Sequence, residues 1–340
     1  MNTPAAADPT LEDWKNLYAA ALDFRALVPW QWTADTDVFG VRDPETGEIG
    51  WCSVFGAARQ VYGLMVYEGT EGLLIHHGMA TGQLPAEDAG YLQRGLLVSF
   101  EDRAALDRED LATIKRLGLT SRGRRAWPKF RRYDPGFLPW RLSGAAVRFL
   151  TVSLPQAVHV AGRLRDDPEA VAPDRAGRFL VRVTDAACAL WHDQRLAPPP
   201  PVREAPPPVD ELRLRRLLGR LHRDAVRWEC DYYHSPAIID DGERRPYFAS
   251  LVLLVDQQSG MVLHMELGEP PLRPGVACNQ FLDALERLGT IPQTVVVKRG
   301  LVHAALADVA KGLGLSLQLE HALPALDAAR SALAAHLRRT

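Results

Sequence analysis

The sequence predicts a two-domain α+β protein, with an antiparallel sheet and helices in its N-terminal half and a mixed sheet with flanking helices in its C-terminal half. Three observations support this prediction. The chain has 340 residues, and a single core rarely grows beyond about 250. A Pro-rich segment separates two stretches of regular hydrophobic patterning. The first stretch is rich in strand-like runs, whereas the second passes from a β-hairpin into alternating strands and helices, which implies a mixed sheet.

The N-terminal half begins with an amphipathic helix. Residues Thr10-Leu11-Glu12-Asp13 form an acidic variant of the capping box, apolar residues follow at helical spacing, and Pro29 predicts the end of the helix. Strand-like runs come next, and the Pro and Gly of Asp43-Pro44-Glu45-Thr46-Gly47-Glu48 predict a tight reversal between the first two. The predicted strands cover residues 38–41, 49–55, 62–67, 72–75 and 179–183. Further helices are predicted over residues 107–117 and 145–164.

The Pro-rich segment over residues 197–209 is predicted to be a linker. Its prolines cannot donate the hydrogen bonds of a sheet, and they favour the extended polyproline II conformation. A ligand for a proline-reading module is the alternative, which the position between two folded patterns disfavours. We therefore expect an N-terminal domain over residues 1–196 and a C-terminal domain over residues 210–340, each with its own core.

The C-terminal half has a recognisable order of elements. A helix leads into the strand around Trp228, a hairpin turns at Ser259-Gly260, and strands and helices then alternate to the end. This order resembles the ribonuclease-H-like fold of retroviral integrases and transposases. The predicted strands cover residues 228–231, 247–256, 261–266, 294–297 and 315–319, and the predicted helices cover residues 212–221, 280–288, 303–313 and 325–337.

The resemblance implies where catalytic carboxylates would stand. Two-metal phosphodiester chemistry needs carboxylates from different strands that converge on Mg²⁺ ions about 4 Å apart. Asp231 matches the first, but Lys298 stands where the second is expected, and an ammonium group cannot bind Mg²⁺. Asp327, or Glu320 slightly earlier, is the candidate for the last. We therefore expect a vestigial site at Asp231, Lys298 and Asp327, with no catalytic residue, metal or cofactor, in which Asp231 pairs with a nearby basic residue such as Lys298.

A second constellation lies in the N-terminal half, where basic and aromatic residues alternate without an acidic residue from Lys115 to Arg132. Arginine and aromatic side chains together bind phosphates and stack on bases. The alternative is a rigid surface loop whose aromatic residues anchor it on the core. The nucleic-acid-binding candidates are Arg122, Arg124, Arg125, Trp127, Lys129, Phe130, Arg131 and Arg132.

Bulk properties narrow the class of protein. The formal net charge of −2 gives no overall attraction to nucleic acid or membrane, so such binding needs a local patch. The N-terminus lacks the pattern of a secretory signal, and no run of eighteen apolar residues occurs, so we expect a cytoplasmic protein without a membrane partner. Cys52, Cys188, Cys230 and Cys278 lie far apart, which predicts small buried hydrophobes rather than a zinc site.

Several motifs resemble those of a family of uncharacterised bacterial proteins built of two domains of unknown function. They include Val28-Pro29-Trp30-Gln31-Trp32, Asp43-Pro44-Glu45-Thr46-Gly47-Glu48, Tyr62-Gly63-Leu64 with Tyr67-Glu68-Gly69, and the run from Trp127 to Gly136 with Pro139-Trp140. No activity and no catalytic residue come with this resemblance.

The function expected from these observations is that of a non-enzymatic binding or regulatory protein that contacts nucleic acid through the basic segment. Two alternatives stay open: a metal-dependent hydrolase or nuclease that uses Asp231, and a protein-interaction or assembly module. A Mg²⁺ ion beside Asp231 would favour the hydrolase, and a basic groove lined by Trp127 and Phe130 would favour nucleic-acid binding. An exposed apolar patch alone would favour assembly.

Overall fold

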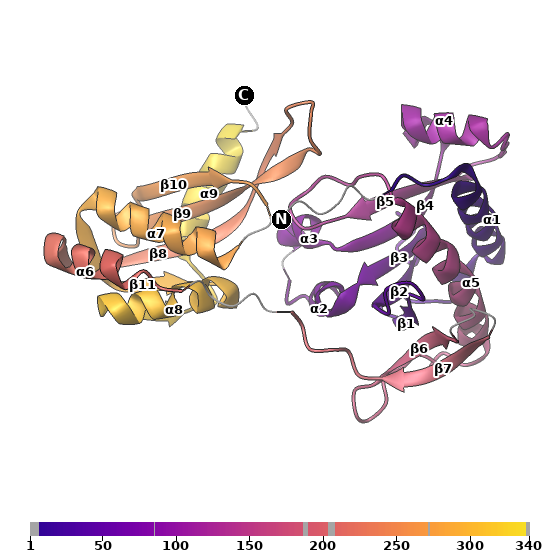
Figure 1. The fold of residues 1–340 in the computed structure, drawn as a ribbon, viewed down its shortest axis with the longest axis horizontal. Helices are drawn as coiled ribbons and strands as arrows, with labels where there is room; N and C mark the ends of the chain where they lie inside the picture. Colours follow the sequence, from indigo (N-terminus) through magenta and orange to yellow (C-terminus); the bar gives the residue numbers. More distant parts are fainter. Residues whose placement is uncertain (1–6, 85, 186–189, 203–207, 271–272, 338–340) are drawn as a thin grey trace. The chain divides into compact units, whose positions relative to one another are not determined.

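The computed structural model describes residues 7–84, 86–185, 190–202, 208–270 and 273–337 (Figure 1). The chain divides into two compact units. Unit 1 comprises Met1–Asp134 and Pro139–Val202, and unit 2 comprises Pro135–Leu138 and Arg203–Thr340. The predictions made for Cys188 and for residues 203–207 of the Pro-rich segment concern residues outside the described ranges.

Seven strands of the described residues form the sheet of unit 1, in the order β5-β4-β3-β2-β1-β6-β7. Their bounds are β1 (Phe39–Arg42), β2 (Ile49–Phe55), β3 (Gly63–Glu68), β4 (Gly95–Glu101), β5 (Trp127–Tyr133), β6 (Phe179–Thr184) and β7 (Trp191–Leu196). Every neighbouring pair is antiparallel except β1 and β6, which run parallel. The predicted antiparallel sheet of the N-terminal half is therefore confirmed.

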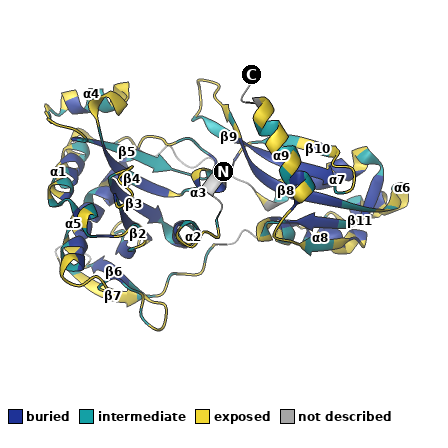
Figure 2. Cartoon of the chain, turned by 180° about the vertical axis from the view of Figure 1, so that it is seen from behind, coloured by how far each residue is buried: buried dark blue, intermediate teal, exposed yellow. Residues whose placement is uncertain are grey.

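Helices cover both faces of this sheet. On one face, α1 (Leu11–Leu27) and α5 (Gly144–Asp166) close the larger core, and on the other α2 (Gly69–Ala80) packs on a smaller one (Figures 1 and 2). The predicted capping box starts α1, since the Asp13 amide donates to Thr10 Oγ1 at 3.1 Å and the Thr10 amide donates to Asp13 Oδ2 at 2.8 Å. The remaining helical segments of unit 1 are α3 (Ala86–Leu92), α4 (Arg108–Arg116), η1 (Pro29–Gln31) and η2 (Arg103–Ala105).

The structure of unit 1 differs in two places from what the sequence indicated. Residues 72–75 were expected to form a strand, but they lie within α2, where Leu73 is buried and the next residue, Leu74, is 52% exposed. So short an apolar run fits either structure by its period alone. The second difference is β5 (Trp127–Tyr133), since these residues form a strand and not the rigid surface loop that the sequence offered as an alternative. This strand lies at the edge of the sheet, where a missing backbone donor is tolerated.

The sheet of unit 2 has five strands in the order β10-β9-β8-β11-β12. Their bounds are β8 (His222–Ile239), β9 (Tyr247–Asp256), β10 (Val262–Gly268), β11 (Thr290–Val297) and β12 (Ser316–Leu319). Strand β9 is antiparallel to β8 and β10, whereas β11 is parallel to β8 and β12. In chain order the sheet reads 3-2-1-4-5 with only the second strand reversed, which is the ribonuclease-H-like topology that the sequence predicts.

Two layers of helices enclose this sheet. One face carries α7 (Pro274–Leu288) and α8 (Gly300–Leu313), with α6 (Glu211–Arg220) beside α8, over the main core of unit 2. The opposite face carries α9 (Pro324–Leu337), which packs on β8 and β9. Cys52, Cys230 and Cys278 are buried and free, as the sequence predicts.

Unit 2 also includes a short segment from the N-terminal half of the sequence. The Phe248 amide of β9 donates to the Gly136 carbonyl at 2.8 Å, and the Leu138 amide donates to the Pro246 carbonyl at 3.1 Å. The segment Pro135–Leu138 therefore extends the antiparallel pairing at the start of β9. The boundaries predicted at residues 197–209 stay a prediction, and sequence patterning gave no sign of this added segment.

Candidate functional site

The position of the Asp231 side chain is set by the central strand β8. Side chains alternate along a strand, so Glu229, Asp231 and Tyr233 share one face. Tyr233 packs in the core beneath α9, which identifies that face as the one that α9 covers. The Asp231 side chain is only 5% exposed, so it is a buried carboxylate that requires compensation of its charge.

Arg299 supplies a positive charge that compensates Asp231. Its Nε lies 3.3 Å from Asp231 Oδ2, and its side chain is largely buried. Strand β11 ends at Val297 and Arg299 caps α8, so the chain turns between these two residues. Among the described residues Lys298 forms no ion pair with Asp231, and the basic partner predicted for Asp231 is thus displaced by one position, from Lys298 to Arg299.

The second carboxylate on this face, Glu229, is fully buried and holds α9 in place. Its Oε2 accepts the Leu326 amide at 2.8 Å, and its Oε1 accepts Nε2 of Gln257 at 3.1 Å. Hydrogen bonds from the first turn of a helix stabilise a carboxylate, because the amides there have no partner within the helix. Glu229 therefore acts as an anchor for the start of α9.

Asp327 lies on the first turn of α9, where its amide donates to the Leu323 carbonyl at 2.7 Å. Within the described part of the chain, no group of three or more His, Cys, Asp or Glu side chains is arranged to hold a metal ion. Asp231 and Asp327 are thus not members of such a group.

A second arginine lies on the same face, since the Arg330 guanidinium of α9 stands 4.7 Å from the centre of the Tyr233 ring. Burial raises the pKa of Tyr233 to about 12, with Arg330 opposing the rise and Asp231 adding to it. Burial also raises the pKa of the Cys230 thiol to about 12, and the charge of Asp231 contributes. Tyr233 and Cys230 are therefore neutral at physiological pH, and the charged groups of this face are its carboxylates and the arginines beside them.

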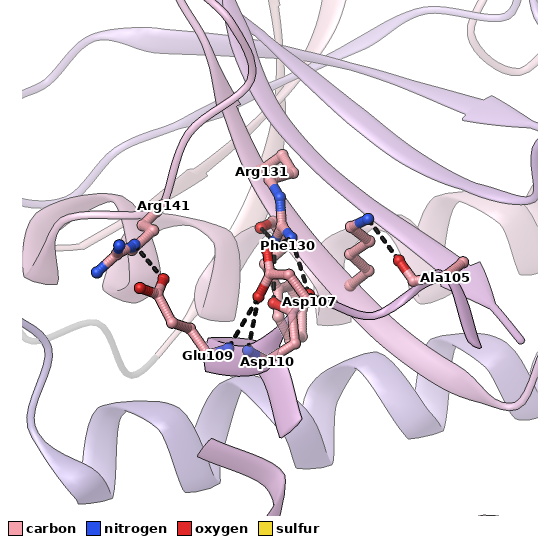
Figure 3. A network of polar contacts seen from close by, with 8 residues as sticks. Ala105, Asp107, Glu109, Asp110, Phe130, Arg131 and Arg141 are labelled. Atoms are coloured by element: carbon pink, nitrogen blue, oxygen red, sulfur yellow. Dashed lines mark hydrogen bonds and ion pairs between the residues drawn. The ribbon is translucent and has the colours of Figure 1, made fainter. Parts of the chain in front are cut away.

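The basic segment of unit 1 is largely neutralised where it forms β5. Arg131 Nη1 donates to Asp110 Oδ1 at 2.9 Å and Arg131 Nη2 to Asp107 Oδ2 at 2.5 Å (Figure 3). Burial disfavours the charged form of Arg131, but the hydrogen bonds and charges of Asp110 and Asp107 outweigh it and raise the pKa of Arg131. These contacts hold the guanidinium of Arg131 against the first turn of α4.

Arg132 is likewise paired with carboxylates. Its Nη1 and Nη2 donate to the two carboxylate oxygens of Glu68 at 3.1 and 2.9 Å, and its Nε donates to Asp134. Lys129 Nζ donates to the Ala105 carbonyl at 2.7 Å. These contacts join β5 to neighbouring elements of unit 1, which is a structural role.

The aromatic members of the segment face the core. Phe130 is 3% exposed and packs edge-on against Tyr18 of α1, with ring centroids 5.0 Å apart. Its ring is therefore not available for stacking on a base, which corrects its place among the predicted binding residues. Trp127 is half-buried against the same core, with the Arg103 guanidinium 5.8 Å from its ring.

The loop before β5 holds the remaining candidates. Arg122 and Arg124 are exposed, and neither forms an ion pair within the described residues. The Arg125 guanidinium stands over the Tyr62 ring at 4.4 Å, while the Arg125 amide donates to Asp102 Oδ1 at 2.7 Å. Within the described residues, Arg122, Arg124 and Arg125 form no ion pair with a carboxylate, and Lys129 donates to a backbone carbonyl instead.

The ion pair on β8 leads to a stability prediction. Replacing Arg299 with Ala leaves the buried Asp231 carboxylate without this cation, and loss of one partner of a buried pair costs about 3–5 kcal/mol. Because Arg299 is partly exposed, we expect a loss of roughly 2–3 kcal/mol in the free energy of unfolding. The matched control, Lys298→Ala, is expected to change it by less than about 0.5 kcal/mol. Urea unfolding of both variants measures the difference, and equal effects would contradict the assigned pairing.

No helix of the described residues is both long and apolar enough to cross a membrane.

No curated protein matches the sequence. Two solved structures are similar to parts of the chain. The first is the Mos1 strand transfer complex, which is 14% identical; the match covers 73% of this chain and 66% of the Mos1 chain, with a TM-score of 0.20. The second is a pre-cleavage Mos1 transpososome, which is 12% identical; the match covers 75% of this chain and 78% of the Mos1 chain, also with a TM-score of 0.20. The chain thus spans slightly less than two thirds of the first. A TM-score of 0.20 is too low to support a common fold, so the ribonuclease-H-like fold rests on the strand order of unit 2.

Two family descriptions match the sequence. The domain of unknown function DUF7309 matches residues 14–182, within unit 1 apart from the short segment Pro135–Leu138. The domain of unknown function DUF6930 matches residues 213–334, which contain the five strands of unit 2. The chain therefore joins two domains of unknown function, DUF7309 and DUF6930, which confirms the family resemblance drawn from its sequence.

Proposed function

We propose that this chain is a non-enzymatic binding protein whose ribonuclease-H-like domain has lost metal-dependent phosphodiester chemistry. The observation that carries the proposal is the contact between the Arg299 guanidinium and Asp231, 3.3 Å apart on the face where a metal ion would have to bind. A guanidinium is permanently charged and repels Mg²⁺, and it occupies the carboxylate oxygen that a metal would need.

The use of Glu229 supports the same conclusion. A metal site needs carboxylate oxygens that are free to turn toward the ion, but both oxygens of Glu229 accept hydrogen bonds from Gln257 and Leu326. Releasing them would leave the start of α9 without its anchor and bury an uncompensated charge. The carboxylates of this face thus serve the stability of the fold.

We further propose that the N-terminal domain contacts nucleic acid through the loop before β5. Support comes from Arg122, Arg124 and Arg125, whose guanidinium groups form no ion pair within the described residues. Unneutralised arginines close together attract phosphate groups and release bound counterions on binding. The proposed interface is smaller than the one predicted from sequence, because Phe130, Arg131 and Arg132 have structural partners.

Metal titration tests the loss of chemistry. Calorimetry with Mg²⁺ and Mn²⁺ is expected to detect no site-specific binding at about millimolar metal, because Arg299 competes for Asp231. Incubation with single-stranded and double-stranded DNA and RNA in the same metals should leave the strands intact. Metal-dependent cleavage that disappears in Asp231→Asn would overturn this proposal and favour the hydrolase.

Salt dependence tests the nucleic-acid contact. With three arginines on phosphates and a factor of roughly 0.7 per contact on a single strand, log K should fall with log salt at a slope of about −2. The double variant Arg122→Ala/Arg124→Ala is expected to reduce this slope to about −0.7. Fluorescence anisotropy with labelled single-stranded DNA and RNA measures it.

The control for this experiment is Arg175→Ala, which removes another exposed arginine of unit 1 and should leave the slope unchanged. Thermal melts show whether each variant is folded. If the folded wild type does not bind at low salt, the nucleic-acid proposal fails. If Arg175→Ala lowers the slope as much as the double variant does, the binding depends on the positive charge of unit 1 as a whole and not on this loop.

A further inference from the structure

Unit 1 contains a pocket of about 430 Å³ where four segments meet that lie apart in the sequence. These segments are the end of α1 with η1, the loop that leads into β3, strand β4, and the loop that leads into β5. The side chains that matter for its chemistry are Arg25, Trp30, Tyr62, Phe100, Arg124 and Arg125. Its volume is within the range of roughly 300–1,000 Å³ that is typical of small-molecule sites.

The pocket concentrates positive charge. None of Arg25, Arg124 and Arg125 forms an ion pair with a carboxylate among the residues that the structure describes, in contrast to Arg131. Arg25 Nε donates to the Arg125 carbonyl at 3.0 Å, which fixes the loop before β5 against α1. Asp102, the acidic residue that contacts this loop, accepts the Arg125 backbone amide. Three guanidinium groups without acidic partners provide the donors that an anion such as phosphate needs.

Aromatic side chains form the other wall. Trp30 meets Tyr62 edge-on with ring centroids 5.2 Å apart, and Phe100 lies behind Trp30 at 5.7 Å. Trp30 and Tyr62 are half-buried residues that line the pocket, and the Arg125 guanidinium stands over one face of the Tyr62 ring at 4.4 Å. Gly56 permits this arrangement, because a Cβ at that position would lie 2.4 Å from Trp30 Cβ and 2.9 Å from Tyr62 Cδ1. Aromatic side chains beside arginines are suited to a planar ring.

Residues with strained backbone conformations lie at or beside this pocket. Within the described residues the non-glycine residues with positive φ are Val28, Arg59 and Arg125, at 54°, 58° and 50°. Val28 and Arg125 line the pocket, and the Arg59 carbonyl lies 3.5 Å from Arg125 Nη2. Such conformations cost free energy and cluster at ligand sites, where surrounding contacts hold them.

We propose that this pocket binds a small anion that carries a planar ring, with the chemistry of a nucleoside monophosphate. The phosphate would lie against Arg25, Arg124 and Arg125, and the base would pack against Trp30 and Tyr62. The inference rests on the proposed binding role of the N-terminal domain and names the ligand of its loop before β5. The ligand is a free mononucleotide or the 5′-phosphorylated end of a single strand, since both present the same chemistry.

Calorimetry on the full-length protein tests the pocket, with AMP, GMP, CMP, UMP, adenosine and ribose 5-phosphate as probes. At least one mononucleotide is expected to bind, adenosine is expected not to bind, and ribose 5-phosphate should bind at least tenfold more weakly. Arg124→Ala should weaken mononucleotide binding at least tenfold. The control Arg175→Ala removes the same charge from another exposed arginine of unit 1 outside the pocket, and it should change the affinity less than twofold.

Competition experiments distinguish the sources and the possible failures. If a 5′-phosphorylated 12-mer binds more tightly than its 5′-hydroxyl counterpart and AMP displaces it, the ligand is a strand end. If mononucleotides bind but neither 12-mer does, the ligand is a free nucleotide, and the nucleic-acid role fails while the pocket stands. If both 12-mers bind equally and AMP does not compete, the pocket assignment is overturned while the nucleic-acid role stands. The pocket assignment would also be overturned if the folded wild type bound no mononucleotide, or if the two arginine variants weakened mononucleotide binding equally.

Discussion

The buried charge on the central strand of unit 2 is the constraint on which the rest of that unit depends. Glu229 and Asp231 point into the layer beneath α9, where an isolated carboxylate would be costly. The protein compensates one with the start of α9 and Gln257, and the other with Arg299. Both carboxylates of this face are therefore engaged by other groups of unit 2, which is the physical basis for the proposal that this domain has lost metal-dependent chemistry.

The N-terminal domain handles charge in two ways. Along β5, Arg131 and Arg132 are paired with carboxylates and tie the edge strand to α4 and β3. In the loop before β5, Arg124 and Arg125 have no such partners among the described residues and lie beside aromatic rings. The same basic run of sequence therefore combines a structural part with a part whose charge is available for binding.

Sequence patterning predicted the elements that carry a strong local signal. Thr10 and Asp13 cap α1, and the order of strands after Trp228 gives the sheet of unit 2. It failed where tertiary context decides, as for Leu73 in α2 and for Pro128 in an edge strand. It expected a nearby basic residue such as Lys298 to pair with Asp231, and the structure pairs Asp231 with Arg299, because the choice between adjacent basic residues depends on where β11 ends. The vestigial site itself stays a prediction. The pocket was missed because Arg25, Tyr62 and Arg125 come from distant segments, although Arg124 and Arg125 were candidates.

The central claim is that an arginine of the protein occupies the place of a catalytic metal. Anomalous diffraction from crystals soaked in Mn²⁺ tests it most directly, because Mn²⁺ accepts the oxygen ligands that Mg²⁺ prefers and gives its own signal. The account predicts no anomalous peak at Asp231 and the Arg299 guanidinium still in contact with its carboxylate. A peak at about 2.1 Å from an Asp231 oxygen, with Arg299 displaced, would contradict it.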